Sequence, residues 1–456
     1  MSANYFSEFQ QKMQAASISQ AAIKAFERNY EALVSNENTL ISEQEISPVS
    51  DIPSWSKLEK KYATPDASLL DQTVIIKLNG GLGTSMGLQK AKSLLKVKGE
   101  DTFLDLIVKQ VISLRAQSGH KVRLLFMNSF STSEDTLSYL SRYADQELAA
   151  PEEVELMQNR IPKIDAETFR PVTWPASPDL EWCPPGHGDL YPALLGSGWL
   201  DRLLTAGIKY AFVSNSDNLG ATLDPALLTW FAQSGAPFAM EVTRRTAADK
   251  KGGHLALRNS DGHLVLREIA QCPDDDLGEF QDIDKHQYFN TNNLWIRLDS
   301  LAEVLKENEG VLPLPMIKNK KTVDPRDAAS TPVYQLETAM GAGIECFSGA
   351  VAMDVPRSRF APVKTTADLF ALRSDAYIVT STGQIQLAPE RNNIPPTITL
   401  DPKLHKLVDS LDQLGSPSLL YVDKLTVDGD VRFKVGVKLE GSLEFRTDGN
   451  SPLYVE

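Results

Sequence analysis

Cysteine is scarce in this chain of 456 residues, which contains only Cys183, Cys272 and Cys346. Three cysteines so far apart make neither a disulfide framework nor a zinc site, so we expect a protein of a reducing compartment. Apolar runs long enough to span a membrane are also missing. The first residues lack the basic-then-apolar order of a signal peptide. These absences predict a cytoplasmic protein without a membrane segment.

Positive charge is in deficit, because 46 Lys and Arg residues face 60 Asp and Glu residues and the formal net charge is -14. A surface of this sign disfavours nucleic acids and anionic membranes as partners. Against this background, residues 74–98 contain five lysines and, from Lys77 to Lys98, no carboxylate. Such a local excess of positive charge predicts a segment that binds phosphate groups.

The same segment contains a glycine-rich loop. An apolar, β-branched run at residues 74–76 is typical of a buried strand and leads into Asn79-Gly80-Gly81-Leu82-Gly83. Glycines allow a sharp turn and present N–H groups to a ligand with no Cβ in the way. The Walker sequence is absent, and the glycine spacing is one residue too long for the dinucleotide fingerprint. A purely structural turn is the competing interpretation, which the lysines make less favourable.

Strand-like and helix-like patterns alternate from about residue 73 and predict an α/β fold. We expect a mixed, mostly parallel sheet with helices on both faces. The predicted domains are a helical arm with a polar linker (1–65, the linker at 35–53), a catalytic domain (66–388) and a small C-terminal β domain (389–456). The predicted strands of the catalytic domain are 74–77, 122–127, 154–157, 210–214, 239–242, 264–269 and 294–296.

Three polar segments follow predicted strands at their carboxyl ends: the Gly80 loop, Gln158 and Asp217. Ligands of open α/β sheets bind beyond these ends, so the three segments indicate one crevice. A lone Asp at a strand end is more often a turn former or helix cap, and an isolated His such as His187 is usually structural.

Longer motifs cover most of the middle of the chain. They are LNGGLGTSMG (78–87) with Lys92-Ser93 and TFLDL (102–106), MNSF (127–130), PPGHGDLY (184–191), VSNSDNLGAT (213–222), EVT with KGG (241–253), FNTNNLWI (289–296), QLETAMGA (335–342) and VPRSRFAPVKTTADL (355–369). Together they resemble the eukaryotic-type UTP–glucose-1-phosphate uridylyltransferases, also called UDP-glucose pyrophosphorylases.

The resemblance implies a Rossmann-like nucleotidyltransferase with a β-helix-like C-terminal domain. Such an enzyme makes UDP-glucose and pyrophosphate from UTP and α-D-glucose 1-phosphate, reversibly and with Mg²⁺ as cofactor, by in-line attack on the α-phosphorus of UTP. Whether the chain forms a homo-oligomer stays open. Two alternatives also stay open: a pyrophosphorylase for galactose or N-acetylglucosamine phosphate, and a non-catalytic UDP-sugar-binding regulator on the same scaffold.

The resemblance also assigns roles to matching residues. Lys92 would hold the triphosphate, Lys364 would neutralise the reacting phosphoryl groups, and Asp217 would be the Mg²⁺ ligand. An exposed surface lysine is the ordinary interpretation of Lys364. Arg357 and Arg359 either assist it or pair with surface carboxylates. The residues expected to bind substrate are Leu78, Asn79, Gly80, Gly81, Gln158 (uracil), Gly186 (uridine), His187 (sugar phosphate), Asn215 and Asn292 (sugar hydroxyls or a turn).

Overall fold

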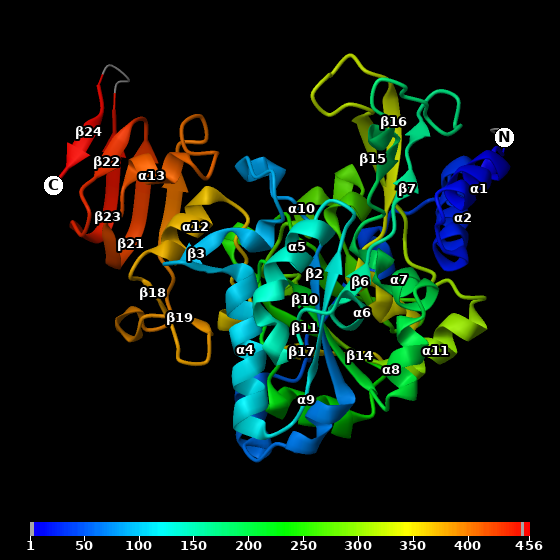
Figure 1. Cartoon of the computed structure of the whole chain (residues 1–456), viewed down its shortest axis with the longest axis horizontal. Coiled ribbons are helices and arrows are strands. Elements are labelled where there is room, and N and C mark those ends of the chain that lie inside the picture. Colours follow the sequence, from blue (N-terminus) through cyan, green and yellow to red (C-terminus); the bar gives the residue numbers. More distant parts are fainter. Residues whose placement is uncertain (1–3, 448–450) are drawn as a thin grey trace.

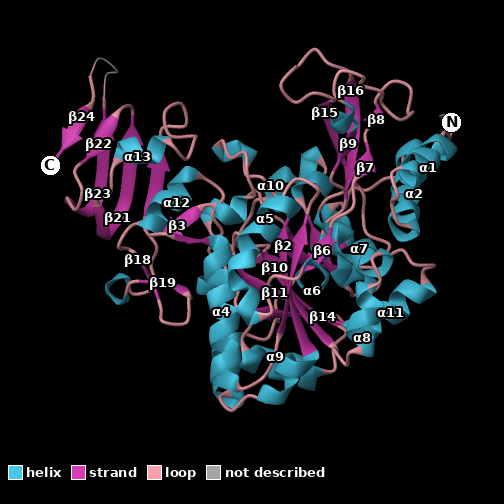
Figure 2. Cartoon of the chain, in the orientation of Figure 1, coloured by secondary structure: helices cyan, strands magenta, loops and turns pink. Residues whose placement is uncertain are grey.

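The computed structural model describes residues 4–447 and 451–456, and a large mixed sheet with helices on both faces forms its centre (Figures 1 and 2). In this part of the chain the sheet has ten strands, with the order β1-β12-β14-β10-β2-β5-β6, and β11, β13 and β17 attached. The bounds are β1 Ile46–Pro48, β2 Thr73–Asn79, β5 Arg123–Asn128, β6 Glu155–Met157, β10 Tyr210–Asn215, β11 Phe238–Arg244, β12 His254–Arg258, β13 Leu264–Arg267, β14 Tyr288–Arg297 and β17 Val351–Asp354.

The predicted mixed sheet is confirmed, but its antiparallel share is larger than the apolar runs indicated. The parallel pairs are β2 with β10 and β5, β5 with β6, and β11 with β17. Strand β14 lies antiparallel between β10 and β11. A continuous apolar run shows that both faces of a strand are buried, whatever its direction. Most parallel pairs of the sheet lie in the group β6-β5-β2-β10. The Gly80 loop, Gln158 and Asp217 follow strands β2, β6 and β10 of this group.

Several predicted strand boundaries are wrong, and β5 begins at Arg123 rather than at Val122. Val154 ends helix α6 (Pro151–Val154), so the strand begins at Glu155. Strand β13 ends at Arg267, and Ile269 begins a 3-10 turn. Strand β14 also extends well before residue 294 and includes Asn292, whose φ is +57°. The β11–β14 register shifts there, so Asn292 lies at a bulge within the strand.

Side chains of β2 alternate between two apolar layers. Val74 and Ile76 pack with helices α7 (Leu190–Gly196), α8 (Trp199–Thr205) and α11 (Leu298–Glu307), whereas Ile75 packs with α4 (Phe103–Ser118) and α9 (Pro225–Ser234). Lys77 follows the same alternation, so its side chain lies on the α4 face. It is buried there, which is unusual for a lysine.

The N-terminal arm consists of helices α1 (Phe6–Ala15) and α2 (Gln20–Val34). Their apolar faces pack on β7 (Ile161–Pro162), β9 (Trp182–Cys183) and Leu336 of β16 (Pro332–Glu337). The expected linker at 35–53 contains strand β1, which pairs with β12. Glu43 holds this segment, since it binds buried Arg267 at 2.6 Å and His286 at 2.9 Å. Such tertiary contacts have no local sequence pattern, which is why the strand was missed.

A small sheet of β8 (Ile164–Asp165), β16 and β15 (Ile317–Thr322) projects beside the arm (Figure 1). At the opposite end, β20 (Thr397–Leu400), β21 (Ser418–Asp428) and β23 (Lys438–Arg446) pair in parallel, as do β22 (Val431–Phe433) and β24 (Leu453–Val455). The β-helix and the two boundaries between the three domains stay predictions. The remaining helices and strands are α3 Trp55–Leu58, β3 Lys96–Lys98, β4 Asp101–Thr102, α5 Ser133–Leu140, α10 Leu277–Phe280, α12 Thr366–Arg373, β18 Tyr377–Val379, β19 Ile385–Leu387 and α13 Ser410–Leu414.

Among residues 4–447 and 451–456, no helix combines the length and the apolar character needed to cross a bilayer.

Candidate active site

Two lysines from distant segments meet one carboxylate beyond the carboxyl end of β10. The Nζ atoms of Lys92 and Lys364 lie 2.7 and 3.1 Å from Asp217 Oδ2. Asp217 follows β10, Lys92 follows the glycine-rich loop after β2, and Lys364 precedes α12. Because β2 and β10 are parallel neighbours, their carboxyl ends bring the first two segments together.

The charge state of Asp217 follows from its surroundings. Burial alone would raise its pKa, but the ammonium groups of Lys364 and Lys92 together hold that pKa below its ordinary value. The side chain is therefore ionised at neutral pH although only 13% of it is exposed. Its Oδ1 atom is buried and has no hydrogen-bond partner among the residues that the structure describes. One oxygen of the carboxylate is thus engaged by cations and the other is unsatisfied.

An unsatisfied carboxylate oxygen fits a hard cation, which prefers oxygen ligands. Within the described ranges, no cluster of three or more His, Cys, Asp or Glu side chains is arranged to ligate a metal. Mg²⁺ commonly takes one or two carboxylates and completes its shell with phosphate and water. The single carboxylate of Asp217 is compatible with that mode of binding.

The main chain of the glycine-rich loop fixes Lys92. Its N–H donates to Gly81 O at 3.1 Å, and its ammonium group donates to Val363 O. Gly83 has φ +67°, and a Cβ there would lie 2.8 Å from Leu88 and 3.3 Å from Lys92. A Cβ at Gly81 would meet no atom within 4 Å, so this glycine faces open space. Gly83 is therefore required for packing, whereas Gly81 is not.

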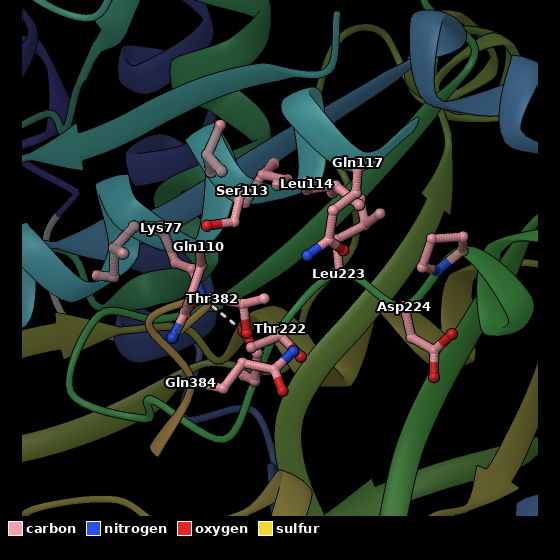
Figure 3. A pocket seen from close by; sticks show the side chains of 15 residues that line it. Lys77, Gln110, Ser113, Leu114, Gln117, Thr222, Leu223, Asp224, Thr382 and Gln384 are labelled. Carbon is pink, nitrogen blue, oxygen red and sulfur yellow. Dashed lines mark hydrogen bonds between the residues drawn. The ribbon is translucent and has the colours of Figure 1, made fainter. Parts of the chain in front are cut away.

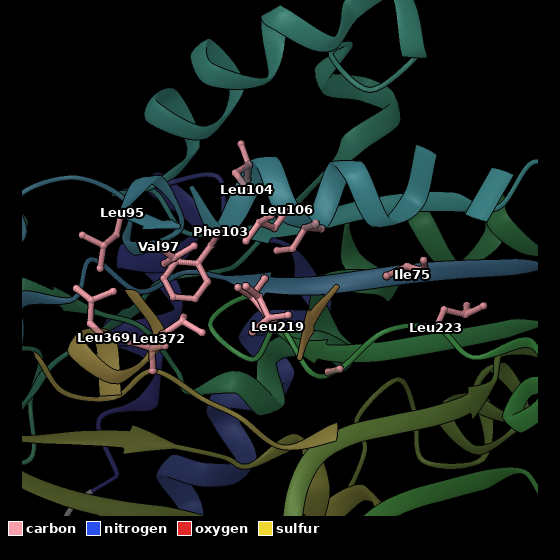
Figure 4. Packing of buried hydrophobic residues seen from close by; sticks show 14 of the residues in the cluster. Ile75, Leu95, Val97, Phe103, Leu104, Leu106, Leu219, Leu223, Leu369 and Leu372 are labelled. Carbon is pink, nitrogen blue, oxygen red and sulfur yellow. The ribbon is translucent and has the colours of Figure 1, made fainter. Parts of the chain in front are cut away.

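The segments that carry Lys92, Asp217 and Lys364 all contribute side chains to one apolar cluster. It includes Leu95 after Lys92, Leu219 after Asp217, and Leu369 of α12 after Lys364. Figure 4 shows Leu95, Val97, Leu369 and Leu372 around Phe103 of α4. Apolar packing therefore sets the relative positions of main chains whose side chains carry the charges.

Three residues expected at the base lie in contact. Gln158 Nε2 donates to Gly186 O at 3.0 Å, and a Cβ at Gly80 would lie 2.6 Å from Gln158 Oε1. Gly186 has φ +80°, and a Cβ there would lie 2.6 Å from Thr338 O. An amide has two donors and one acceptor, so Gln158 retains groups for a ligand. Glycine at positions 80 and 186 is needed for these close approaches.

His187 is held as a neutral ring. Its Nδ1 accepts a hydrogen bond from Met340 N at 2.9 Å. Burial, with a smaller contribution from the Lys364 charge, lowers the pKa of His187 to about 4. The hydrogen of the neutral ring is therefore on Nε2, because Nδ1 is an acceptor. His187 can donate one hydrogen bond to a ligand without carrying charge.

Asn79 lies at the site, but its amide is used within the protein. It is buried, and it donates to Asn128 Oδ1 at 2.8 Å and Thr136 Oγ1 at 2.9 Å. Ser216 Oγ donates to its Oδ1 at 3.3 Å. A substrate contact at Asn79 would therefore come from the main chain.

The main chain of Leu78 is also engaged, since its carbonyl accepts from Ser216 N at 3.0 Å. Asn215 ends β10, and its carbonyl accepts from Asn218 N at 3.2 Å. Asn292 Oδ1 accepts from Asn290 Nδ2 at 2.9 Å, which supports the bulge in β14.

Neither Arg357 nor Arg359 is a free cation. Arg357 pairs with Asp249 at 2.8 and 2.9 Å. Arg359 pairs with Glu241. Asp249 and Glu241 are both buried, so the expectation of surface carboxylates is wrong for both arginines. Arg359 and Glu241 each lie in one of the motifs that carry the resemblance, yet nothing in the sequence indicates that they pair with each other.

Asp189 is a further residue that sequence reasoning missed. It is buried and accepts from the main-chain N of Asn159 at 2.6 Å and from its side chain at 3.0 and 3.1 Å. Burial raises the pKa of Asp189 to about 7. These bonds tie the turn that carries Gln158 to the turn that carries Gly186 and His187. Its position in the Gly-His-Gly-Asp sequence was the available signal.

A separate cavity of about 290 Å³ lies on the α4 face of the sheet, lined among others by Lys77, Gln110, Ser113, Thr222 and Gln384 (Figure 3). It includes none of the predicted site residues. Lys77 is fixed at its edge by bonds to Ser214 Oγ at 2.8 Å and Ala221 O at 2.6 Å. The candidate active site is therefore the group of residues around Asp217, Lys92 and Lys364.

Comparisons with known proteins agree with the resemblance. Residues 23–440 match the family model for UTP–glucose-1-phosphate uridylyltransferase. The chain is 41% identical over 410 residues to the UTP–glucose-1-phosphate uridylyltransferase of Solanum tuberosum, covering 89% of this chain and 81% of that protein. It is 42% identical over 378 residues to the enzyme of the same name from Hordeum vulgare, covering 82% of this chain and 77% of that protein.

Solved structures give the same result. The UDP-glucose pyrophosphorylase of Leishmania major superposes with a TM-score of 0.93 at 45% identity, covering 100% of this chain and 98% of that one. The UDP-glucose phosphorylase of Trypanosoma brucei superposes with a TM-score of 0.91 at 46% identity, covering 100% and 97%. The chain therefore belongs to the UTP–glucose-1-phosphate uridylyltransferase family.

Proposed function

We propose that this chain makes UDP-glucose and pyrophosphate from UTP and α-D-glucose 1-phosphate, in a reversible reaction. The observation that carries the proposal is the convergence of Lys92 and Lys364 on Asp217. Two cations beside a carboxylate suit a polyphosphate substrate, and the amide of Gln158 offers donor and acceptor groups to a base.

The reaction needs no protein nucleophile, because the attacking phosphate of glucose 1-phosphate is already anionic at neutral pH. Its oxygen forms a bond to the α-phosphorus of UTP, and the bond from that phosphorus to the β-phosphate oxygen breaks. Pyrophosphate leaves with the electron pair of that bond. Catalysis then consists of holding the reactants in line and neutralising charge.

The two lysines supply that charge from this chain. Lys92, fixed by Gly81 O beside the loop, would bind the triphosphate of UTP. Lys364, which is 57% exposed, would reach the phosphoryl groups at the reacting centre. Both ammonium groups pair with Asp217 Oδ2 and would also be within reach of phosphate oxygens of bound substrates.

Asp217 is the residue that would hold Mg²⁺, through its unsatisfied Oδ1. Bound Mg²⁺ neutralises phosphate charge and orients phosphate oxygens. Its use is proposed here from the chemistry of Asp217 and from the divalent metal that nucleotidyltransferases generally use.

Base and sugar would bind on either side of the phosphates. Gln158 would pair with uracil, and glycine at 80 and 186 would let the nucleotide approach the main chain. His187 would donate its Nε2 hydrogen to the sugar phosphate, while Asn215 and Asn292 would face the sugar side. We also propose a cytoplasmic location, which the free cysteines Cys183, Cys272 and Cys346 support.

The test is product formation by purified protein with UTP, ATP, GTP and CTP, each combined with the 1-phosphates of glucose, galactose and N-acetylglucosamine. We expect UDP-glucose and pyrophosphate from UTP and glucose 1-phosphate, and UTP from UDP-glucose and pyrophosphate in reverse. A higher kcat/KM with another sugar 1-phosphate would assign a different substrate. Binding of UDP-glucose without turnover would indicate a regulator instead.

A further inference from the structure

Glu241 is a buried carboxylate at the centre of β11. Its Oε2 accepts from Arg359 Nε at 2.8 Å and Asn293 Nδ2 at 2.9 Å. Its Oε1 accepts from Arg359 Nη2 at 2.7 Å and Trp295 Nε1 at 3.0 Å. Only 1% of Glu241 is exposed. The pair is bidentate and shielded from water, so Glu241 fixes the guanidinium group in both position and direction.

The main chain of Arg359 and of the residues that follow it is also held by hydrogen bonds. Its carbonyl accepts from Asn218 Nδ2 at 3.1 Å and from Asn293 Nδ2 at 3.3 Å. Asn218 Oδ1 in turn accepts from Ala361 N at 3.0 Å. One side chain therefore bonds the main chain on both sides of residue 360.

The fixed main chain ends at Lys364. Val363 N donates to Asp217 O at 3.2 Å, directly before the lysine. Beyond it, Asp368 accepts from Lys364 N at 2.8 Å and caps helix α12 together with Thr365. Lys364 thus lies between two anchored points. Its own side chain is 57% exposed and has many rotamers, so the position of the main chain decides where its charge can reach.

We infer that Glu241 is a positioning residue of the transferase reaction, acting through Arg359 and residues 361–363 to place Lys364 at the reacting phosphates. The inference rests on the proposed function. A buried ion pair adds little stability compared with apolar residues of the same size, although removing one partner is costly. The Glu241–Arg359 pair therefore has a role in placing Lys364, in addition to its small contribution to the stability of the fold.

The test is a double-mutant cycle in kcat between Glu241→Gln and Lys364→Ala. Glu241→Gln should lower kcat roughly tens-fold and change KM for UTP less than about three-fold, because the loop, Lys92 and Gln158 do not touch Glu241. In the Lys364→Ala background, Glu241→Gln should cost at most about two-fold more. Losses that multiply in the double variant would overturn the inference, because Glu241 would then act independently of Lys364.

The matched control is Arg357→Met, two residues from Arg359 on the same turn. Arg357 pairs with Asp249 instead, and its side chain is 38% exposed. This variant should keep kcat within about two-fold of the unchanged protein. An equal loss in Arg357→Met would overturn the inference, since any change near this turn would then lower kcat.

Folding is checked by circular dichroism and thermal unfolding. If Glu241→Gln does not fold, Glu241→Asp replaces it in the same cycle, because it keeps the charge and shifts the contact. Absence of UDP-glucose formation by the unchanged protein would refute the proposed function and this inference with it. Multiplying losses in an active protein would refute the inference alone.

Discussion

Lys364 Nζ lies 3.1 Å from Asp217 Oδ2 although 147 residues separate them in the chain. Lys92 Nζ lies 2.7 Å from the same oxygen. The carboxylate therefore gathers two cations from segments that share no secondary-structure element. Each of the three charges can be removed separately, and the expected effects differ.

Lys364→Ala should lower kcat roughly tens-fold or more, with little change in UTP affinity. The reason is that an exposed lysine from the segment before α12 should contribute mainly when both substrates are present. Initial rates in both directions and UTP binding by calorimetry measure the two effects. Wild-type kcat in both directions would show that Lys364 is an ordinary surface lysine.

Lys92→Ala should impair both UTP binding and turnover, since Lys92 is fixed beside the glycine-rich loop before any substrate binds. Lys92→Arg should restore only part of the activity, because a planar fork does not replace a compact ammonium group. Comparing KM for UTP with kcat in both variants measures the two effects. A kcat loss with unchanged UTP affinity would contradict this role.

Asp217→Ala should lose activity at saturating substrate, because the variant removes the unsatisfied oxygen proposed to hold Mg²⁺. Excess chelator should inactivate the unchanged protein, and added Mg²⁺ should restore it. Circular dichroism should show a retained fold in Asp217→Ala. Near-normal turnover in that variant or in chelator would remove the metal assignment.

Gln158→Ala should reduce the preference for UTP over other triphosphates. A site that loses one buried hydrogen-bonding partner loses about 2 kcal/mol of discrimination, roughly 30-fold. Gly80→Ala should raise KM for UTP, because the new Cβ would lie 2.6 Å from Gln158 Oε1. Gly99→Ala is the contrasting glycine variant, since its Cβ would meet no atom within 4 Å, although its φ of +57° adds local strain. A UTP-to-CTP ratio of kcat/KM that is unchanged in Gln158→Ala would refute the base assignment.

Asp189 should make stability depend on pH. Burial raises its pKa from 3.8 to about 7, so the folded state keeps the proton more tightly than the unfolded state. Its contribution to the free energy of unfolding is fully present below about pH 4 and is lost as pH rises through about 7. Denaturant titrations from pH 4 to 8 should show this loss in the unchanged protein and not in Asp189→Asn. The same slope in both proteins would contradict the assignment.

The sequence predicted most of the central strands because buried apolar runs are local signals, as at β2, β5 and β10. It also indicated that the Gly80 loop, Gln158 and Asp217 share one end of the sheet. Lys364 had no local signal, since an isolated lysine is normally exposed, and only the resemblance singled it out. Glu241 with Arg359 and Asp189 with Asn159 were beyond reach, because each pair joins segments that meet only after the chain folds.

Because Lys92 and Lys364 both pair with Asp217, an anion from solution must displace this carboxylate in order to bind both lysines. Chloride or a singly charged organic acid carries no more charge than the Asp217 carboxylate, which already contacts both ammonium groups. An anion must bring several charged oxygens in a fixed arrangement to win both cations from it. We therefore expect polyphosphates, and not singly charged anions, to displace Asp217 from the two lysines.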